Sequence, residues 1–290
     1  MKKKALVLSG GGVKGTLQVE ILKELEKKGE LKNLNFIIGS SVGAINGSII
    51  ASGKISAVNL CQIYPDMIKS IFKKRLIPPI YDRRNFIDIW RRRIGVVKMK
   101  DLITPMIITA IDFAGKKTHF FKSWEDKEED VMNVVLRSFA APFYFGFLSD
   151  CANTGRVYGD GGMGDDNLPI TEAILEAVNL DWFNEEEVKF IVIGTGYVDI
   201  TEKCDVVAKE GFIRQTLDFV KPSDGGFARM VSRTEQLGQL EFICKKFKNV
   251  HFDYYDIQIP KSMDKMDAVN LIPQYKEYGL KASIKPLISM

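Results

Sequence analysis

The first 53 residues alternate between short apolar runs and segments whose apolar positions recur at helical spacing. Residues 5–8 form a continuous apolar run, which predicts a short buried strand. Over residues 16–28, leucine and isoleucine recur every three or four positions, which predicts an amphipathic helix that ends before Gly29. A second apolar run at residues 35–38 precedes a segment of small residues that predicts another helix. This strand-helix-strand-helix order predicts parallel strands in an α/β sheet.

The rest of the chain continues as a mixture of strands and helices. Apolar runs predict strands at residues 106–111, 117–121, 156–158, 189–193 and 253–259, and helical spacing predicts helices at 127–140 and 227–247. Residues 58–100 mix apolar and basic positions and are broken by Pro78 and Pro79, which is more typical of an inserted cap than of a core layer. Since no internal repeat or low-complexity linker occurs, we expect one domain over residues 1–290.

The composition is that of an ordinary globular protein, with 46% hydrophobic and 27% charged residues in 290. Its four cysteines are widely separated and lack the paired spacing of zinc or redox sites, so free thiols in a reducing cytoplasm are expected. The amino-terminal segment has a basic start but only four apolar residues before the glycines, too few for a signal-peptide core. We therefore expect a cytoplasmic protein.

A glycine-rich segment, SGGGVKG at residues 9–15, follows the first predicted strand. Its spacing Gly10-x-Gly12-x-x-Gly15 matches a dinucleotide-binding fingerprint. That fingerprint also requires an acidic residue at the end of the second strand, about 20 positions further on. No Asp or Glu occurs between Glu30 and Asp66, so a dinucleotide cofactor is not expected.

The second predicted strand ends in GSSVG at residues 39–43, a G-x-S-x-G pattern on a strand-to-helix turn. In such a nucleophile elbow the central serine lies on a sharp turn, and the flanking glycines permit close packing. Ser41 is therefore the candidate nucleophile, and the amides of Gly11, Gly12 and Val13 on the neighbouring strand end are available to an oxyanion. The helix that begins after Ser41 also directs its dipole toward an anion formed there.

Four sequence blocks, in this order, resemble those of the patatin-like phospholipase family. They are GGGVKG at residues 10–15, the elbow at 39–43, AAPFYF at 140–145, and DGG at 160–162. The segment at 106–121 and the strand that ends in GTG at 194–196 also look like their counterparts. The resemblance covers about residues 4–196 and leaves 197–290 as an extension with helical and strand segments.

The resemblance implies a three-layer α/β/α fold with a mostly parallel central sheet. It also implies an enzyme that hydrolyses the acyl esters of a phospholipid or lysophospholipid. It implies a Ser-Asp dyad without histidine, in which Ser41 is the nucleophile and Asp160 its base. By position, the oxyanion hole would consist of Gly10, Gly11, Gly12 and Val13, and the supporting residues would be Lys14, Gly15, Gly39, Gly43, Gly161 and Gly162. We expect no cofactor and no metal. Some bacterial members are switched on by partners or small nucleotides, and these residues identify no such activator.

The residues themselves make a dyad plausible. Only two histidines occur, His119 and His251, and neither lies in a turn suited to a base, whereas Asp160 is flanked by glycines. Because aspartate, with a reference pKa of about 3.9, is a poor base toward serine, we expect a dry site that makes the carboxylate more basic.

Two alternative functions stay open. A Ser-Asp-His esterase of the α/β-hydrolase type would use His251, which follows Ser41 and Asp160 in the required chain order. An acyltransferase would also form an acyl-serine, but such enzymes usually place a histidine beside the elbow serine, where this chain has Ser40.

Two further charged features also have more than one interpretation. Lys14 could attract a phosphate or support the oxyanion loop, or it could be a solvated loop charge. The pair Asp165-Asp166 could bind a divalent ion, but two adjacent acids without a partner cluster are more typical of a solvated loop or helix cap.

Residues 69–100 carry the strongest local charge. Eleven Lys or Arg residues stand against two Asp, a local charge of +9 in a chain whose total is +4. Because apolar residues are interleaved with these cations, the segment could lie on the inner face of an anionic cell membrane. A cap with a solvated cationic face is the equally open alternative. No nucleic-acid-binding motif occurs, so nucleic acid is not an expected partner.

Overall fold

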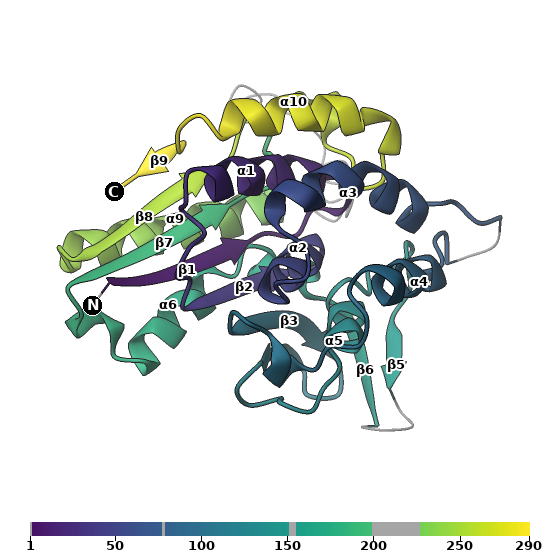
Figure 1. Cartoon of the computed structure of the whole chain (residues 1–290), viewed down its shortest axis with the longest axis horizontal. Coiled ribbons are helices and arrows are strands. Elements are labelled where there is room, and N and C mark those ends of the chain that lie inside the picture. Colours follow the sequence, from purple (N-terminus) through teal and green to yellow (C-terminus); the bar gives the residue numbers. More distant parts are fainter. Residues whose placement is uncertain (1, 77–78, 151–154, 199–226) are drawn as a thin grey trace, which may run out of the picture.

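The computed structural model describes residues 2–76, 79–150, 155–198 and 227–290 (Figure 1). The strands are β1 Lys2–Leu8, β2 Phe36–Ser40, β3 Met106–Asp112, β4 Lys117–Lys122, β5 Leu148–Asp150, β6 Arg156–Asp160, β7 Glu187–Ile193, β8 Val250–Tyr255 and β9 Ile288–Ser289. The α-helices are α1 Gly15–Lys27, α2 Val42–Ala51, α3 Ala57–Ile71, α4 Arg83–Arg93, α5 Val131–Ser138, α6 Ile170–Asn179, α9 Phe227–Lys246 and α10 Ile272–Ala282. Every strand predicted from the sequence has its counterpart among these.

The strands form one mixed sheet in the order β5-β6-β3-β2-β1-β7-β8-β9, with β4 paired to the other edge of β3. The five central strands β3, β2, β1, β7 and β8 run parallel, and the outer strands β4, β6, β5 and β9 pair antiparallel with their neighbours. The mostly parallel sheet expected from the strand-helix alternation is confirmed.

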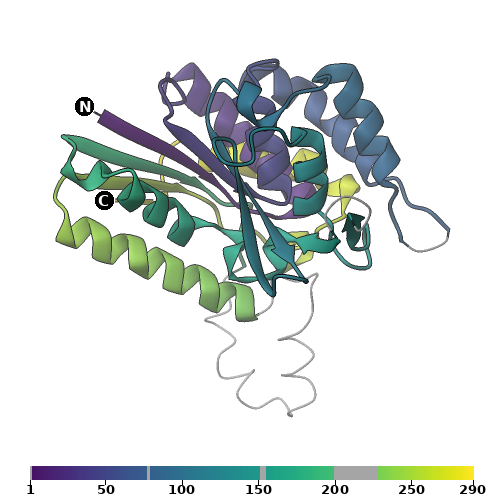
Figure 2. The same cartoon turned by 90° about the horizontal axis from the view of Figure 1, so that it is seen from below.

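Helices cover both faces of this sheet (Figure 2). Alternate residues of β1 divide between two hydrophobic clusters, with Leu6 and Leu8 in one and Ala5 and Val7 in the other. The first cluster contains the buried faces of α1, α2, α3, α5 and α10, and the second those of α6 and α9. This period of two along a strand is what a sheet buried on both faces requires, and the three-layer α/β/α fold is confirmed.

The basic segment at residues 58–100, expected as a cap-like insertion, contains α3 and α4. The helix α3 packs along α1 and so belongs to the helical layer, and α4 packs against α3 and α5. The apolar residues Tyr81, Phe86 and Trp90 of this segment are buried. The carboxyl-terminal helix α10, which the apolar pattern does not predict, packs against α1. The expected extension at 197–290 is described at residues 197–198 and from residue 227 onward.

One edge of β3 brings two distant strands together. The parallel strand β2 pairs with its first half, ending at Ser40 opposite Thr109. The antiparallel strand β6 pairs with its second half and ends at Asp160 opposite Ala110. Since Thr109 and Ala110 are adjacent, the carboxyl ends of β2 and β6 meet on the same edge of β3.

Candidate active site

Ser41 is the single residue between β2 and α2, and its backbone conformation is strained. Its φ of 52° and ψ of −118° lie outside the regions that side chains normally permit. The turn is tight because glycines flank it: a Cβ on Gly39 would lie 2.5 Å from the carbonyl oxygen of Gly43, and one on Gly43 would collide with the Leu8 carbonyl. The strand-to-helix elbow predicted from G-x-S-x-G is therefore present, with Ser41 at the amino terminus of α2.

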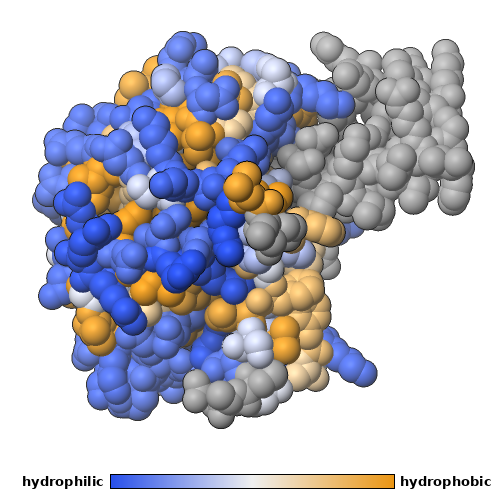
Figure 3. All heavy atoms as spheres, turned by 90° about the vertical axis from the view of Figure 1, so that its right-hand side faces the viewer, coloured by the Kyte–Doolittle hydropathy of each residue, from blue (hydrophilic) through white to orange (hydrophobic). Residues whose placement is uncertain are grey.

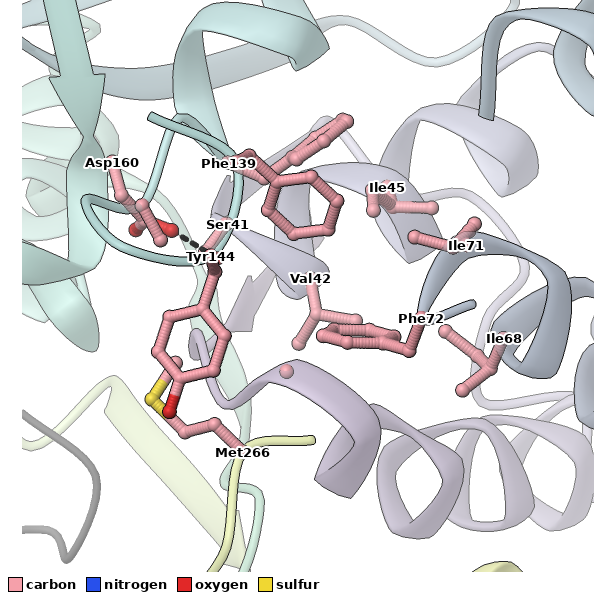
Figure 4. A pocket seen from close by; sticks show the side chains of 13 residues that line it. Ser41, Val42, Ile45, Ile68, Ile71, Phe72, Phe139, Tyr144, Asp160 and Met266 are labelled. Atoms are coloured by element: carbon pink, nitrogen blue, oxygen red, sulfur yellow. Dashed lines mark hydrogen bonds between the residues drawn. The ribbon is translucent and has the colours of Figure 1, made fainter. Parts of the chain in front are cut away.

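The hydroxyl of Ser41 donates a hydrogen bond of 2.7 Å to Oδ2 of Asp160 (Figure 4). The other carboxylate oxygen, Oδ1, accepts a bond of 2.7 Å from the amide of Gly162, and the amide of Ser41 donates to Oγ of Ser138 at 2.9 Å. Ser41 and Asp160 are only 5% and 4% exposed. The two residues proposed as a dyad thus lie in direct contact, in a site largely closed to water.

The glycine loop at residues 10–13 lies beside Ser41, since a Cβ on Gly10 would come within 3.1 Å of the Ser41 Cβ. The amide of Gly10 donates to the carbonyl of Asn167 at 2.8 Å, and the amide of Val13 donates to that of Met266 at 2.7 Å. Both amides are therefore engaged in this conformation. Within the described part of the chain, the amides of Gly11 and Gly12 donate to no backbone carbonyl.

Three groups that are distant in the sequence hold this loop in place: the Thr195 hydroxyl, the Asp264 carboxylate and the Met266 carbonyl. The hydroxyl of Thr195 donates to the carbonyl of Gly10 at 2.9 Å. The ammonium group of Lys14 forms a buried ion pair with Asp264. Gly12 has a φ of +59°, and a Cβ there would collide with the carbonyl of Met266. The charge of Lys14 is thus compensated within the protein, which favours its role as a support of the loop over its role as a phosphate site or solvated charge.

A narrow apolar pocket extends from the dyad between α2 and α3 (Figure 4). The space between its lining side chains is about 400 Å³ when the open solvent at its mouth is included, and its closed interior is narrow. Apart from Ser41, Asp160 and the tyrosine hydroxyl, its lining side chains are hydrophobic, and they include Val42, Ile45, Ile68, Ile71, Phe72, Phe139, Tyr144, Phe145 and Met266. The arrangement places a serine hydroxyl and a carboxylate at one end of a narrow space with apolar walls.

Neither histidine contacts the dyad. His251 in β8 lies at the level of Lys189 and Lys4, near the amino ends of the parallel strands. Ser41 follows the opposite end of β2, three strands away. At about 3.3 Å per residue and about 4.8 Å per strand, the two are on the order of 20 Å apart. His119 in β4 packs against another ring of that strand, and burial lowers its pKa.

The remaining predicted site residues lie around the dyad. A Cβ on Gly161 would collide with Thr109 of β3, and one on Gly15 would collide with Val42 of α2, so both glycines permit close packing next to the dyad strands. Asp166 lies in a short 3-10 turn, Asp165–Asn167. Over the described residues, no group of three or more His, Cys, Asp or Glu side chains has the arrangement of a metal site.

Sequence reasoning missed several contacts. It did not identify Ser138 and Asn167 in the site, or Asp264 and Met266 in the carboxyl-terminal third. Thr195 lies in the GTG block at residues 194–196, but the sequence pattern does not indicate what its side chain contacts. The carbonyls of Asn167 and Met266 leave no signal in the sequence, because any residue supplies one.

Comparisons with known proteins identify a family and several relatives of this chain. The model of the family described as patatin-like phospholipase matches residues 6–174. A cGAMP-activated phospholipase of Escherichia coli strain TW11681 is 28% identical over 236 residues, which cover 71% of this chain and 66% of that protein. A cGAMP-activated phospholipase of Vibrio cholerae serotype O1 is 24% identical over 226 residues, 66% of this chain and 63% of that protein. This chain thus spans about two thirds of the length of these relatives.

Among solved structures, VipD from Legionella pneumophila is similar over 95% of this chain and 66% of its own, with 13% identity and a TM-score of 0.45. Within the described ranges, no helix has both the length and the apolar character needed to cross a membrane.

Proposed function

The chain belongs to the patatin-like phospholipase family, and we propose that it hydrolyses carboxylic esters of phospholipids or lysophospholipids through an acyl-serine intermediate. The observation that carries this proposal is the hydrogen bond of 2.7 Å from the Ser41 hydroxyl to Asp160, made in a buried site at the end of an apolar pocket. A nucleophile within reach of its base is the first geometric requirement of covalent catalysis.

In the acylation step, Oγ of Ser41 attacks the ester carbonyl carbon and its proton passes to Oδ2 of Asp160. The bond between that carbon and the leaving alcohol then breaks, and the alcohol departs with the proton from Asp160. In deacylation, water attacks the acyl-serine and gives its proton to Asp160, which returns it to Ser41 as the fatty acid leaves. The Gly162 amide on Oδ1 keeps Oδ2 directed at Ser41 throughout.

The tetrahedral oxyanion of each step needs donors that are already in place. We propose the amides of Gly11 and Gly12, because those of Gly10 and Val13 donate to the carbonyls of Asn167 and Met266. The amino terminus of α2 adds a favourable dipole. Loss of one such donor typically costs a factor of about 10² to 10³ in rate.

The apolar pocket supports an acyl chain as the bound part of the substrate. Its hydrophobic side chains would lie along the chain while the ester carbonyl rests against Ser41. We propose action at the cytoplasmic face of a membrane. Both described cysteines, Cys61 and Cys244, are free, as in a reducing compartment; Cys151 and Cys204 lie outside the described residues.

Two relatives are named cGAMP-activated phospholipases, and we propose that a cyclic dinucleotide also activates this chain. Hydrolysis of phosphatidylglycerol in mixed micelles, measured with and without cGAMP, tests this point. A rise in rate with cGAMP supports activation, whereas an equal rate would show that this chain does not respond to that nucleotide.

The alternative of a Ser-Asp-His esterase has weaker support, because His251 lies on the order of 20 Å from Ser41. An acyltransferase remains compatible with the dyad and differs only in the acceptor of the acyl group. Product analysis separates the two: free fatty acid indicates hydrolysis, and transfer to an added alcohol in preference to water indicates acyltransfer.

The decisive experiment labels the protein with a fluorophosphonate probe. The wild type should be labelled, and Ser41→Ala should not. Asp160→Asn, which keeps the shape of the side chain, should lower hydrolysis by about 10²- to 10⁴-fold. His251→Ala is the matched control and should leave the rate unchanged. Labelling that persists in Ser41→Ala would refute the central claim, and a large loss in His251→Ala would favour the triad.

A further inference from the structure

Three segments beside the pocket are joined by main-chain hydrogen bonds. The amide of Arg75 donates to the carbonyl of Ile80 at 2.7 Å. The amides of Ile80 and Tyr81 donate to the carbonyls of Phe143 and Tyr144, at 3.3 and 2.8 Å. Because Tyr144 and Phe145 line the pocket, this ladder lies directly beside it. We call residues 73–76, 79–81 and 143–147 the pocket rim.

The pocket rim carries three large hydrophobic side chains that face solvent. Leu76 is fully exposed, Phe143 is 74% exposed and Phe147 is 48% exposed. Phe143 has a φ of 65°, a left-handed conformation that is unfavourable for a bulky residue. Single exposed hydrophobic residues are ordinary on a protein surface, but a group of them at the mouth of an apolar pocket is typical of an interaction site.

Cations accompany these side chains. Lys73, Lys74 and Arg75 are exposed and form no salt bridge with another described residue. The next acid after them in the sequence, Asp82, is paired with Arg84 and also lies within electrostatic range of Arg75. Figure 3 views the molecule from the side that carries the pocket rim, and it shows hydrophobic residues interspersed with hydrophilic ones over that face. The rim therefore combines exposed positive charge with hydrophobic side chains.

We propose that the pocket rim docks on an anionic phospholipid bilayer. Leu76 and Phe143 enter the boundary between headgroups and acyl chains, and Lys73, Lys74 and Arg75 bind lipid phosphates. This orientation turns the mouth of the pocket toward the bilayer, so an acyl chain reaches Ser41 without crossing water. The inference deepens the proposed function, because it rests on a lipid substrate. Within the basic segment, it assigns membrane contact to residues 73–76 rather than to the whole of residues 69–100.

The structure offers a matched control in the same segment. The helix α4 begins at the rim, where the Arg83 side chain donates to the carbonyl of Gly146. Its last three residues, Arg91, Arg92 and Arg93, lie about 12 to 15 Å further along the helix axis. That separation exceeds the screening length of about 8 to 10 Å at ordinary ionic strength. Removing these three charges changes the net charge as much as removing the three on the rim.

The test is sedimentation with vesicles, performed in the Ser41→Ala background so that no lipid is consumed. The protein with an unchanged rim should bind mixed vesicles of phosphatidylglycerol and phosphatidylcholine more tightly than vesicles of phosphatidylcholine alone. Changing Lys73, Lys74 and Arg75 to Gln should weaken binding by roughly fivefold per charge. Leu76→Ser with Phe143→Ser should weaken it by roughly tenfold or more. Changing Arg91, Arg92 and Arg93 to Gln should have a much smaller effect.

The outcomes separate docking from catalysis. Equal binding by the rim variants and the α4 variant, or no preference for phosphatidylglycerol, would overturn the proposal. No sedimentation with any vesicle would also overturn it and would favour an acidic protein as the partner of the rim. Hydrolysis of a monomeric short-chain ester by rim variants that retain Ser41 should stay at the wild-type rate, which shows that they are folded. If the wild type has no esterase activity while docking persists, only the proposed function fails.

Discussion

The buried ion pair between Lys14 and Asp264 gives the sharpest test of how the glycine loop is held. Their side chains are only 5% and 6% exposed, so neither charge can be solvated if the other is removed. Breaking a buried pair by deleting one partner costs about 3 to 5 kcal/mol. Because a domain is stable by only about 5 to 15 kcal/mol, we expect Lys14→Met to show a large loss in urea unfolding.

The double variant Lys14→Met with Asp264→Leu distinguishes a structural role from a role in phosphate binding. Replacing both charges with apolar side chains leaves no charge buried, so most of the lost stability should return. If Lys14 instead attracted a lipid phosphate, Lys14→Met would keep its stability and raise KM for a phospholipid but not for an uncharged short-chain ester. A free energy of unfolding within about 1 kcal/mol of the wild type in Lys14→Met would refute the reasoning.

Three other contacts can be tested by single substitutions. Thr195→Val removes the hydrogen bond to the Gly10 carbonyl and should lower kcat by about tenfold while Thr195→Ser does not; equal steady-state kinetics for the two would contradict this. Gly43→Ala places a methyl group against the Leu8 carbonyl and should lower the free energy of unfolding by about 1 to 3 kcal/mol, measured in urea. Burial lowers the pKa of His119 from 6.5, so the folded protein binds this proton less readily than the unfolded chain. Stability should therefore fall as the pH drops below that value, and His119→Phe should flatten the decline seen by denaturation at successive pH values.

The sequence contained the elbow in full because its requirements are local. A serine between two glycines, at the end of an apolar run and before small residues, leaves few other structures for residues 36–51. The position of the proposed base does not follow from local requirements. Asp160 is 119 positions from Ser41, and the pairing of β2 and β6 with β3 brings the two together. No pattern within either segment encodes that encounter, so its identification depended on family resemblance.

Other features lay beyond sequence reasoning for physical reasons. The helix α10 buries Tyr275 and Gly279, and Gly279 packs against the backbone of Leu17. A helix whose buried positions include tyrosine and glycine lacks the aliphatic spacing by which a helix is usually recognised. The cap-like interpretation of residues 58–100 rests on their charge and on Pro78 and Pro79, and it stays a prediction; the buried faces of α3 and α4 rest on a few apolar positions within the segment.

The contacts between residues 13–14 and residues 264–266 have a consequence for the ribosome-bound chain. The glycine loop is synthesised before the groups that fix it, and the last two of these, Asp264 and Met266, follow Lys14 by 250 residues or more. We expect chains of increasing length to react with a fluorophosphonate only once they extend past residue 266, and labelling of shorter nascent chains would contradict this. A cell that makes this protein would thus carry no incomplete, lipid-cleaving form of it during translation.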